Sequence, residues 1–173
     1  LGINADLVTY GKVIGAGMPV GAFGGKKEIM EVVAPLGKVY QAGTLSGNPI
    51  AVLAGYTLLT ELEKNPGIYT ELEEKTNYLK TGLREVLSAW GEPYVINQLG
   101  SMISVHFSEQ PVTDFATASA ANNLRFRKYF HGMLDQGIYL PPSAFESWFL
   151  NNALTKEDLD YTIAATKNTL ARL

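Results

Sequence analysis

The sequence predicts an α/β fold made of two parts, and three observations lead to that class. Of its 173 residues, 46% are hydrophobic and 18% are charged, which is enough apolar material to bury a core. Eleven of the 17 glycines lie within residues 1–55, as is typical of short strands joined by tight turns. Beyond Asn65-Pro66-Gly67 the pattern changes to regular amphipathic segments, which indicates a compact α+β unit. We therefore expect a boundary that separates residues 1–65 from residues 66–173.

The elements of the first part follow from its glycines and its helix signals. β-branched and aromatic residues between the glycines predict strands at Leu7–Tyr10 and Val20–Phe23. A short helical stretch follows Glu28 and ends at Pro35. Asn48-Pro49 suits the N-cap and first turn of a helix, so we expect the apolar run Ile50–Leu62 to be helical.

The elements of the second part follow from apolar spacing. One face of a long helix is marked by apolar residues three, four or seven apart, namely Leu72, Leu79, Leu83, Val86 and Trp90. The alternation in Met102–Phe107 predicts a half-buried strand, with Tyr94–Asn97 as its hairpin partner. We also expect a helix over Ala116–Leu134, strands at Gly137–Leu140 and Trp148–Leu150, and a last helix from Thr155, where Asp158 completes a capping box.

Charge and composition exclude several classes of protein. The net charge is −3, and no basic run is longer than Lys26-Lys27, which argues against binding to nucleic acid or to an anionic membrane surface. No apolar stretch reaches the length of a membrane span, and the N-terminus lacks a signal-peptide pattern. Without cysteine, and with only His106 and His131, we expect no metal site, packing or surface roles for both histidines, and a reduced, cytoplasmic location.

Lys12 is the first candidate for chemistry. It stands between Gly11 and Val13, where a predicted strand runs into glycines, so we expect its amine to lie beside backbone and partly shielded from solvent. Partial burial favours the neutral amine, which can attack a carbonyl carbon to form a Schiff base. A lysine that merely covers the surface fits the same pattern, and spacing alone leaves both interpretations open.

The loop from Gln41 to Pro49 is the second candidate. A helix N-terminus presents free N–H groups and a partial positive charge, while Thr44 and Ser46 add hydroxyl donors. Together these groups predict a seat for a phosphate. A plain turn followed by a helix cap is the alternative interpretation of the same residues.

Three segments together resemble one known family. They are ADLVTYGKVIGAGMPVGAFGG, which contains Lys12, VYQAGTLSGNPIA, which contains Thr44, and HGMLDQGIYLPPSAFES, which contains Glu146. The first resembles the Schiff-base lysine segment of the class III aminotransferases, which are pyridoxal-phosphate enzymes of fold type I. AGTLSGNP at this distance from the lysine is specific to that class. The Phe-Glu pair in the third segment favours the aminomutase branch, which converts glutamate-1-semialdehyde to 5-aminolevulinate in tetrapyrrole synthesis.

The resemblance covers the whole chain and matches the C-terminal portion of that family, somewhat under half of its usual length. Because the first residue is leucine rather than methionine, we expect the rest of a larger polypeptide upstream. The resemblance then implies that residues 1–65 are the end of the large cofactor-binding domain. Residues 66–173 are implied to be its small C-terminal α+β domain.

The resemblance also implies roles for individual residues. Lys12 matches the lysine that holds pyridoxal 5'-phosphate as a Schiff base and moves protons between substrate carbons. Gly43 and Thr44 match a pair that contacts the cofactor phosphate, usually from the neighbouring subunit, so a homodimer with a shared active site is implied. Glu146 matches a carboxylate on the substrate side of the pocket. The implied substrate is a small amino-aldehyde, and the cofactor passes through its pyridoxamine form.

The chain departs from the family pattern at three places. Tyr10 stands where leucine is common, Pro141-Pro142-Ser143 replaces a frequent Ala-Pro-Ser, and Trp148-Phe149 replaces a more usual Gly-Phe. The last two departures change the rim around Glu146, so the role of that residue is less firmly implied than the role of Lys12.

Two other functions stay open. One is an ordinary class III aminotransferase acting between two substrates, although such enzymes commonly bind a carboxylate with a C-terminal arginine and there is none between Arg127 and Arg172. The other is a non-catalytic interaction module. In the resembling enzymes the acid that pairs with the pyridine nitrogen and the aromatic that stacks on the ring lie upstream of residue 1, so this chain alone would then be inert.

Overall fold

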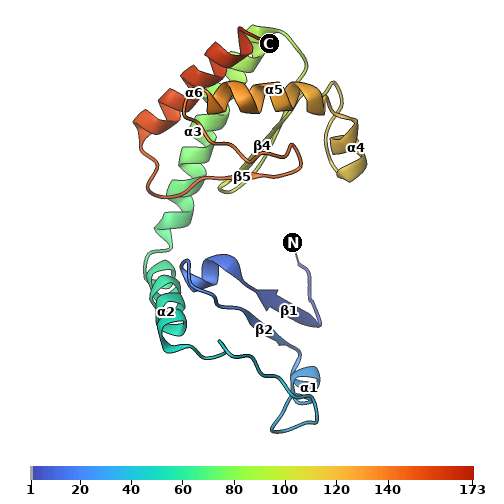
Figure 1. Cartoon of the computed structure of the whole chain (residues 1–173), viewed down its shortest axis with the longest axis vertical. Coiled ribbons are helices and arrows are strands. Elements are labelled where there is room, and N and C mark those ends of the chain that lie inside the picture. The colour runs from blue at the N-terminus through green and yellow to red at the C-terminus, as the bar shows by residue number, and fades with distance from the viewer. Residues whose placement is uncertain (1) are drawn as a thin grey trace. The chain divides into compact units, whose positions relative to one another are not determined.

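The computed structural model describes residues 2–173 and divides the chain into two compact units (Figure 1). The first unit ends at Pro66 and the second comprises Gly67–Leu173. The division falls in the Asn-Pro-Gly segment, where the backbone N–H of Asn65 closes the preceding helix on the carbonyl of Glu61. Pro66 has no N–H with which to extend that helix.

The first unit is a hairpin followed by two helices. Its elements are β1 (Leu7–Tyr10), η1 (Lys12–Gly15), β2 (Ala22–Gly25), α1 (Lys27–Met30) and α2 (Pro49–Lys64). The two strands pair antiparallel, with Leu7 opposite Gly25 and Tyr10 opposite Ala22. The second strand therefore begins and ends two residues later than the sequence predicts. Gly25 extends it because β1 lies so close that a β-carbon there would collide with the carbonyl oxygen of Asp6.

Helix α2 begins as the sequence predicts. The side-chain oxygen of Asn48 accepts hydrogen bonds from the N–H groups of Ile50 and Ala51, both at 3.1 Å, and Pro49 occupies the first turn. Most of this helix is nevertheless uncovered. Within residues 2–66 only Gly15, Ala51 and Gly55 are buried, and most of the large apolar side chains of α2 are exposed.

The second unit packs helices on one face of an antiparallel sheet. Its elements are α3 (Gly67–Trp90), β3 (Val95–Leu99), β4 (Met102–His106), α4 (Phe115–Ala120), α5 (Asn123–Leu134), β5 (Trp148–Phe149) and α6 (Lys156–Leu170). The strand order is β3-β4-β5. Ile103 and Val105 of β4 are buried in the core, which also contains Leu83 of α3, Met133 of α5 and Leu170 of α6.

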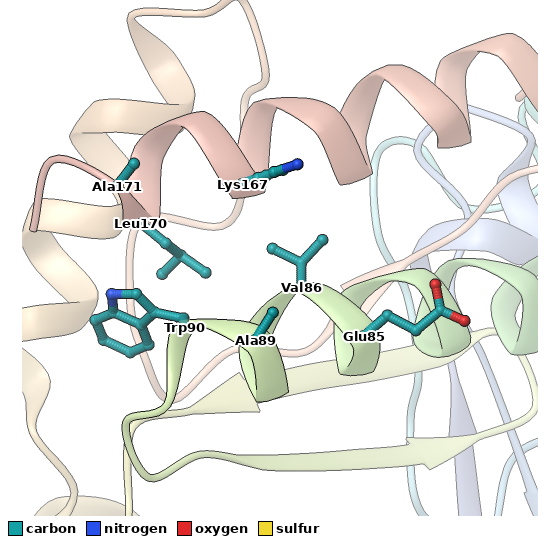
Figure 2. A pocket seen from close by; sticks show the side chains of 7 residues that line it. All are labelled: Glu85, Val86, Ala89, Trp90, Lys167, Leu170 and Ala171. Carbon is teal, nitrogen blue, oxygen red and sulfur yellow. The ribbon is translucent and has the colours of Figure 1, made fainter.

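Helices α3 and α6 lie along each other (Figure 1). Figure 2 shows the side chains of Val86 on α3 and Leu170 on α6 between the two helices, with Trp90 at one end. These residues line a groove of about 350 Å³. Glu85 and Lys167 are the charged residues that line this groove. No helix within residues 2–173 is long and apolar enough to cross a membrane.

Three sequence predictions in the second unit are wrong or only partly right. The predicted helix over Ala116–Leu134 is two helices, because Ala121 is extended and the side chain of Asn122 caps α5 by accepting from the N–H of Arg125. The predicted strand Gly137–Leu140 is irregular chain that pairs with no strand in the described part of the protein. The strand predicted at Trp148–Leu150 ends one residue earlier.

The helical stretch predicted between Glu28 and Pro35 is only partly right, because α1 ends at Met30. The helix cap at Thr155 is confirmed. Thr155 caps α6 and forms the predicted capping box with Asp158, whose carboxylate accepts from the backbone N–H of Thr155 at 2.8 Å. Met102–His106 pairs with Val95–Leu99 as the predicted hairpin. His131 is exposed, whereas His106 is buried.

Candidate active site

Lys12 occupies a strained turn at the end of β1. Its φ angle is 54°, in the left-handed region that residues other than glycine rarely adopt. Such a conformation costs on the order of 1–3 kcal/mol and is often found at functional sites. The turn is closed by hydrogen bonds from the N–H of Ala16 to the carbonyl of Val13 at 3.0 Å and from Met18 to Gly15 at 2.8 Å. The backbone therefore fixes the direction in which the lysine leaves the chain.

The expected shielding of Lys12 is not found in this chain. The residue is exposed, as are Gly11 and Val13 on either side. Its amine makes no hydrogen bond or ion pair with any residue from 2 to 173. The glycines around the lysine explain this, because they contribute no side chains that would cover it. The prediction of a partly buried amine is therefore wrong for the described residues.

The turn that begins at Lys12 packs against α2. Gly55 permits this contact, because the carbonyl oxygen of Ile14 lies only 2.5 Å from the place that a β-carbon on Gly55 would take. Gly15 is buried on the same side, against Val20. A glycine in the middle of a helix costs about 1 kcal/mol relative to alanine. Glycine at position 55 allows the backbones of α2 and of the lysine turn to approach closely. The lysine turn therefore packs against the helix that follows the Thr44 loop.

The Thr44 loop is a tight turn rich in donors. The N–H of Ser46 donates to the carbonyl of Gly43 at 2.9 Å, and the N–H of Asn48 donates to Leu45 at 3.1 Å. Within the described chain, the N–H groups of Thr44, Leu45 and Gly47 and the hydroxyls of Thr44 and Ser46 have no partner. Three N–H groups and two hydroxyls on one short turn suit a phosphate, which offers only acceptors at neutral pH.

The start of α2 does not supply the free N–H groups that the sequence predicts. Asn48 already accepts from two of them, Pro49 has none, and the N–H of Val52 donates to the carbonyl of Asn48 at 2.9 Å. That part of the prediction is wrong, because the Asn48 cap and a bound phosphate would compete for the same N–H groups. The donors available to an anion lie one turn earlier, in the loop itself.

A pocket of about 360 Å³ lies between this loop, the segment Pro19–Gly21 and the first turn of α2. Gly43, Ser46 and Asn48 line it, whereas Thr44 and Lys12 do not. A β-carbon on Gly43 would lie 2.9 Å from the hydroxyl oxygen of Ser46. Glycine at position 43 therefore keeps that hydroxyl uncrowded beside the pocket.

Glu146 lies in the second unit, whereas Lys12, Gly43 and Thr44 lie in the first. Its backbone N–H donates to the carbonyl of Ser143 at 3.1 Å, which holds the loop before β5. The side chain is exposed and makes no ion pair within residues 2–173. Glu146 lines a pocket of about 280 Å³ together with residues of β3, β4 and the loop before α4.

Sequence reasoning gave no site role to His106, yet this histidine lines the Glu146 pocket. Burial without an acidic partner lowers its pKa below the ordinary value of 6.5, so the ring is neutral at pH 7. The signal that could have found it is the alternation of β4. Ser104 and His106 fall on the same face of the strand, opposite the face that enters the core.

Comparison with known proteins gives the family. The sequence model described as "Aminotransferase class-III" matches residues 1–168. The chain belongs to the class III aminotransferase family. The described residues keep that family's mixed α/β character, and the predicted fold class is confirmed.

Individual relatives and solved structures show which proteins the chain is similar to. Over 164 residues the chain is 58% identical to a glutamate-1-semialdehyde 2,1-aminomutase of Flavobacterium johnsoniae, which covers 95% of this chain and 38% of that protein. A β-phenylalanine aminotransferase of Variovorax paradoxus shares 31% identity and a TM-score of 0.85, over 99% of this chain and 39% of that one.

A glutamate-1-semialdehyde aminomutase of Pseudomonas aeruginosa in complex with PMP has the same fold, with a TM-score of 0.84 at 21% identity. It matches 99% of this chain and 40% of that one. The chain thus spans about two fifths of the length of the relatives that it matches, and it corresponds to their C-terminal part.

Proposed function

We propose that this chain is the C-terminal portion of a pyridoxal-phosphate enzyme that isomerises glutamate-1-semialdehyde to 5-aminolevulinate, a step of tetrapyrrole synthesis. The observation that carries the proposal is the 58% identity to an aminomutase across 95% of the chain. Fold alone decides less, because aminomutases and ordinary transaminases share it. In this proposal the unit up to Pro66 is the end of the cofactor-binding domain, and the second unit is the small C-terminal domain.

The donor groups of the first unit fit the cofactor. The unpartnered N–H and hydroxyl groups around Thr44 suit its phosphate, and Gly43 leaves room beside Ser46. Lys12 supplies a primary amine on a turn whose backbone direction is set by its positive φ angle. When bound, the cofactor supplies an electron sink that stabilises negative charge on a substrate carbon.

The residues of this chain then have separate tasks. Lys12 would hold the cofactor covalently through its Nζ and, once released, take a proton from one substrate carbon and return it to another. Thr44 and Gly43 would fix the phosphate end, so that the reacting end is held in one orientation. Glu146, an exposed carboxylate with no ion pair among residues 2–173, would face an amino group of the substrate.

We also propose a homodimer in which the Thr44 loop serves the partner's site. Helix α2, which follows that loop, supports this. Leu53 and Tyr56 are 64% and 67% exposed, and Ile50, Val52 and Leu59 are at least half exposed. A helix that is apolar on several faces is normally covered in the native assembly. A second copy is the occupant that would also bring a Thr44 loop to each site.

The test uses the complete product of the gene that encodes this chain. After incubation with pyridoxal 5'-phosphate and reduction with borohydride, peptide mapping should find the adduct on Lys12. Lys12→Arg should abolish both the adduct and the formation of 5-aminolevulinate, while Lys26→Arg should leave both unchanged. An adduct on another lysine, or full activity of Lys12→Arg, would contradict the proposal.

An ordinary aminotransferase is the second candidate, and the likeness to the β-phenylalanine aminotransferase favours it. The lack of arginine between Arg127 and Arg172 speaks against it, because the segment around Glu146 then offers no guanidinium for bidentate binding of a substrate carboxylate. The two functions differ in their requirement for a second substrate. An aminomutase turns over with glutamate-1-semialdehyde alone, whereas an aminotransferase needs an oxo-acid acceptor. A chain that forms no adduct under either condition would instead be a binding module.

A further inference from the structure

The buried residues of the first unit lie where the two candidate cofactor-binding segments meet. Within residues 2–66 they are Gly15, Ala51 and Gly55. Gly15 belongs to the lysine turn, which comprises residues 12–18, and the other two belong to α2, the helix that follows the Thr44 loop. The packed part of this unit, among the described residues, is therefore the contact that joins these two segments.

Helix α2 is fixed to the Thr44 loop at its first turn. The N–H of Asn48 donates to the carbonyl of Leu45 in the loop at 3.1 Å. The side-chain oxygen of Asn48 accepts from the N–H groups of Ile50 and Ala51, each at 3.1 Å. One residue is thus bonded both to the loop and to the helix. A change in the position of the loop therefore moves the start of α2.

The same face of α2 reaches the lysine turn. Ala51 and Gly55 follow Asn48 by three and seven residues, a spacing that places all three on one face of a helix. At 1.5 Å per residue, the step from Asn48 to Gly55 is about 10 Å. At Gly55 the carbonyl oxygen of Ile14 lies 2.5 Å from the place of a β-carbon, so the helix meets the turn backbone to backbone. Since glycine has no side chain, no rotatable group separates them.

A second contact joins the loop to the turn. Val20 lines the pocket of about 360 Å³ together with Ser46 of the loop. On its other side Val20 meets the lysine turn, because a β-carbon on Gly15 would lie 3.3 Å from its Cβ. The loop and the turn are therefore connected through α2 and also through the wall of this pocket.

The lysine turn is strained, so its conformation depends on what packs against it. Lys12 and Ala16 both have left-handed φ angles, of 54° and 50°. Each such residue costs on the order of 1–3 kcal/mol, and the conformation persists only where the surrounding structure holds it. Hydrogen bonds from the N–H groups of Ala16 and Met18 close the turn, and α2 supplies the packing. Displacement of α2 would therefore let the turn relax and redirect Lys12.

We propose that Gly55 is a positioning residue that links the phosphate seat of the Thr44 loop to Lys12, so that an anion bound at the loop holds the lysine turn in its strained conformation. The inference rests on the proposed function, which assigns phosphate binding to the loop and the reactive amine to Lys12. It goes further by giving α2 the task of connecting them. In the proposed homodimer the loop serves the partner's site, so a phosphate in one site would orient the lysine of the other.

The experiment uses the complete product of the gene without cofactor, and the probe is inorganic phosphate. The readout is hydrogen exchange of the Ala16 and Met18 amides, which close the turn. We expect saturating phosphate to slow their exchange at least about fivefold, the lower end of typical coupling between two sites. Sodium chloride at the same ionic strength should have no effect. The amides of α6 in the second unit serve as the internal reference.

Variants separate the seat from the link. Thr44→Ala should weaken phosphate binding and the protection with it, whereas Thr57→Ala, whose hydroxyl donates to the carbonyl of Leu53 within α2, should change neither. Gly55→Ala should still bind phosphate, but phosphate should no longer slow exchange in the turn. Gly67→Ala is the matched control, because a β-carbon there meets no atom within 4 Å.

A chemical readout separates positioning from packing alone. Pyridoxal lacks the phosphate but keeps the aldehyde, so borohydride reduction traps it on Lys12 while the loop is left to inorganic phosphate. Phosphate should raise the yield of this adduct in the unaltered protein and in Gly67→Ala, but not in Gly55→Ala. Adducts on Lys26, an exposed lysine outside the turn, should not respond. A merely structural defect would lower the yield with and without phosphate alike.

Three outcomes would overturn the inference. They are unchanged exchange in the turn when phosphate is bound, a full response to phosphate in Gly55→Ala, and phosphate binding that is as tight in Thr44→Ala as in the unaltered protein. If Gly55→Ala does not fold, Gly15→Ala replaces it, because its β-carbon presses on Val20 in the same packed contact.

The test is separate from that of the proposed function. A turn that responds to phosphate in a protein without aminomutase activity would sink only the function. An active enzyme whose lysine turn ignores phosphate would sink only this inference.

Discussion

The carbonyl oxygen of Ile14 lies 2.5 Å from the position of a β-carbon on Gly55, so the turn that starts at Lys12 rests directly on the backbone of α2. Glycine at position 55 is the condition for that contact. Because the obstructing atom belongs to the backbone, a larger residue cannot be accommodated by a side-chain rotation. The orientation of the candidate catalytic lysine thus depends on a residue forty-three positions away in the sequence.

Gly55→Ala should loosen the lysine turn. We expect the amides of Ala16 and Met18, which close the turn, to exchange with solvent about tenfold faster, as an overpacking cost of about 1.4 kcal/mol implies. Hydrogen exchange followed by NMR measures this. Gly67→Ala is the matched control, because a β-carbon there meets no atom within 4 Å. Unchanged exchange in Gly55→Ala would show that the turn does not depend on this contact.

A buried hydroxyl pair joins α5 to α6. The Tyr129 hydroxyl lies 2.9 Å from the Thr166 hydroxyl in the core, and Thr166 in turn donates to the carbonyl of Thr162 at 3.0 Å. Thr166→Val should destabilise the second unit by about 1–3 kcal/mol, because it leaves the tyrosine hydroxyl buried and unpaired. Unfolding in urea, followed by tryptophan fluorescence, reports on this unit because Trp90 and Trp148 both belong to it.

A double-mutant cycle tests whether the hydroxyls of Tyr129 and Thr166 stabilise each other. Tyr129→Phe together with Thr166→Val removes both hydroxyls, so we expect it to be less destabilised than the sum of the two single variants by at least about 0.5 kcal/mol. Strict additivity would mean that the two hydroxyls do not depend on each other for their stability.

Structural features that depend on only a few neighbouring residues were predictable from the sequence. Asn48 with Pro49 and Thr155 with Asp158 were identified as helix starts, because a cap involves only residues within one turn. Helical spacing also places Phe126, Tyr129, Phe130 and Met133 on one face of a helix, and all four are buried in the structure.

Features that depend on distant segments were not predictable. The break at Ala121 lies in a run with no proline or glycine, and only the extended backbone and the cap by Asn122 reveal it. His106 lies on the face of β4 away from the core, and it is buried because loops from residues 112–115 and 145–147 border the same pocket. The exposure of Lys12 likewise depends on what packs around it, which residue spacing does not reveal.

Two glycines that lie where helices pack together should differ in how much their substitution by alanine destabilises the second unit. A β-carbon on Gly132 would lie 2.5 Å from Cγ2 of Thr169, a buried residue that also accepts from Gln136 at 2.7 Å. A β-carbon on Gly82 would lie 2.2 Å from Cδ1 and 2.8 Å from Cγ1 of Ile163, a partly buried side chain whose Cδ1 can move away by rotation about χ2. Gly132→Ala should therefore destabilise the second unit by about 1–3 kcal/mol, and Gly82→Ala by less than about 1 kcal/mol. Urea midpoints measure both, and a reversed order would refute the packing argument.

The burial of His106 makes the second unit sensitive to mild acid. Its pKa in the folded chain is lowered by burial from 6.5, so well above pH 6.5 the ring is neutral in both the folded and the unfolded state. As the pH falls toward and below 6.5, His106 binds a proton in the unfolded chain but stays neutral in the folded chain. The free energy of unfolding therefore declines until the pH passes the pKa of the folded state. For a single group the slope is at most about 1.4 kcal/mol per pH unit.

His106→Gln should flatten this decline, because glutamine does not titrate, whereas His131→Gln should preserve it, because that residue is exposed. Urea unfolding of the three proteins at pH 7.5, 6.5 and 5.5 separates these outcomes. Any slope that remains in His106→Gln between pH 7.5 and 5.5 comes from groups other than His106. A decline of equal steepness in His106→Gln and in the unaltered chain would show that His106 is not the group that senses acid.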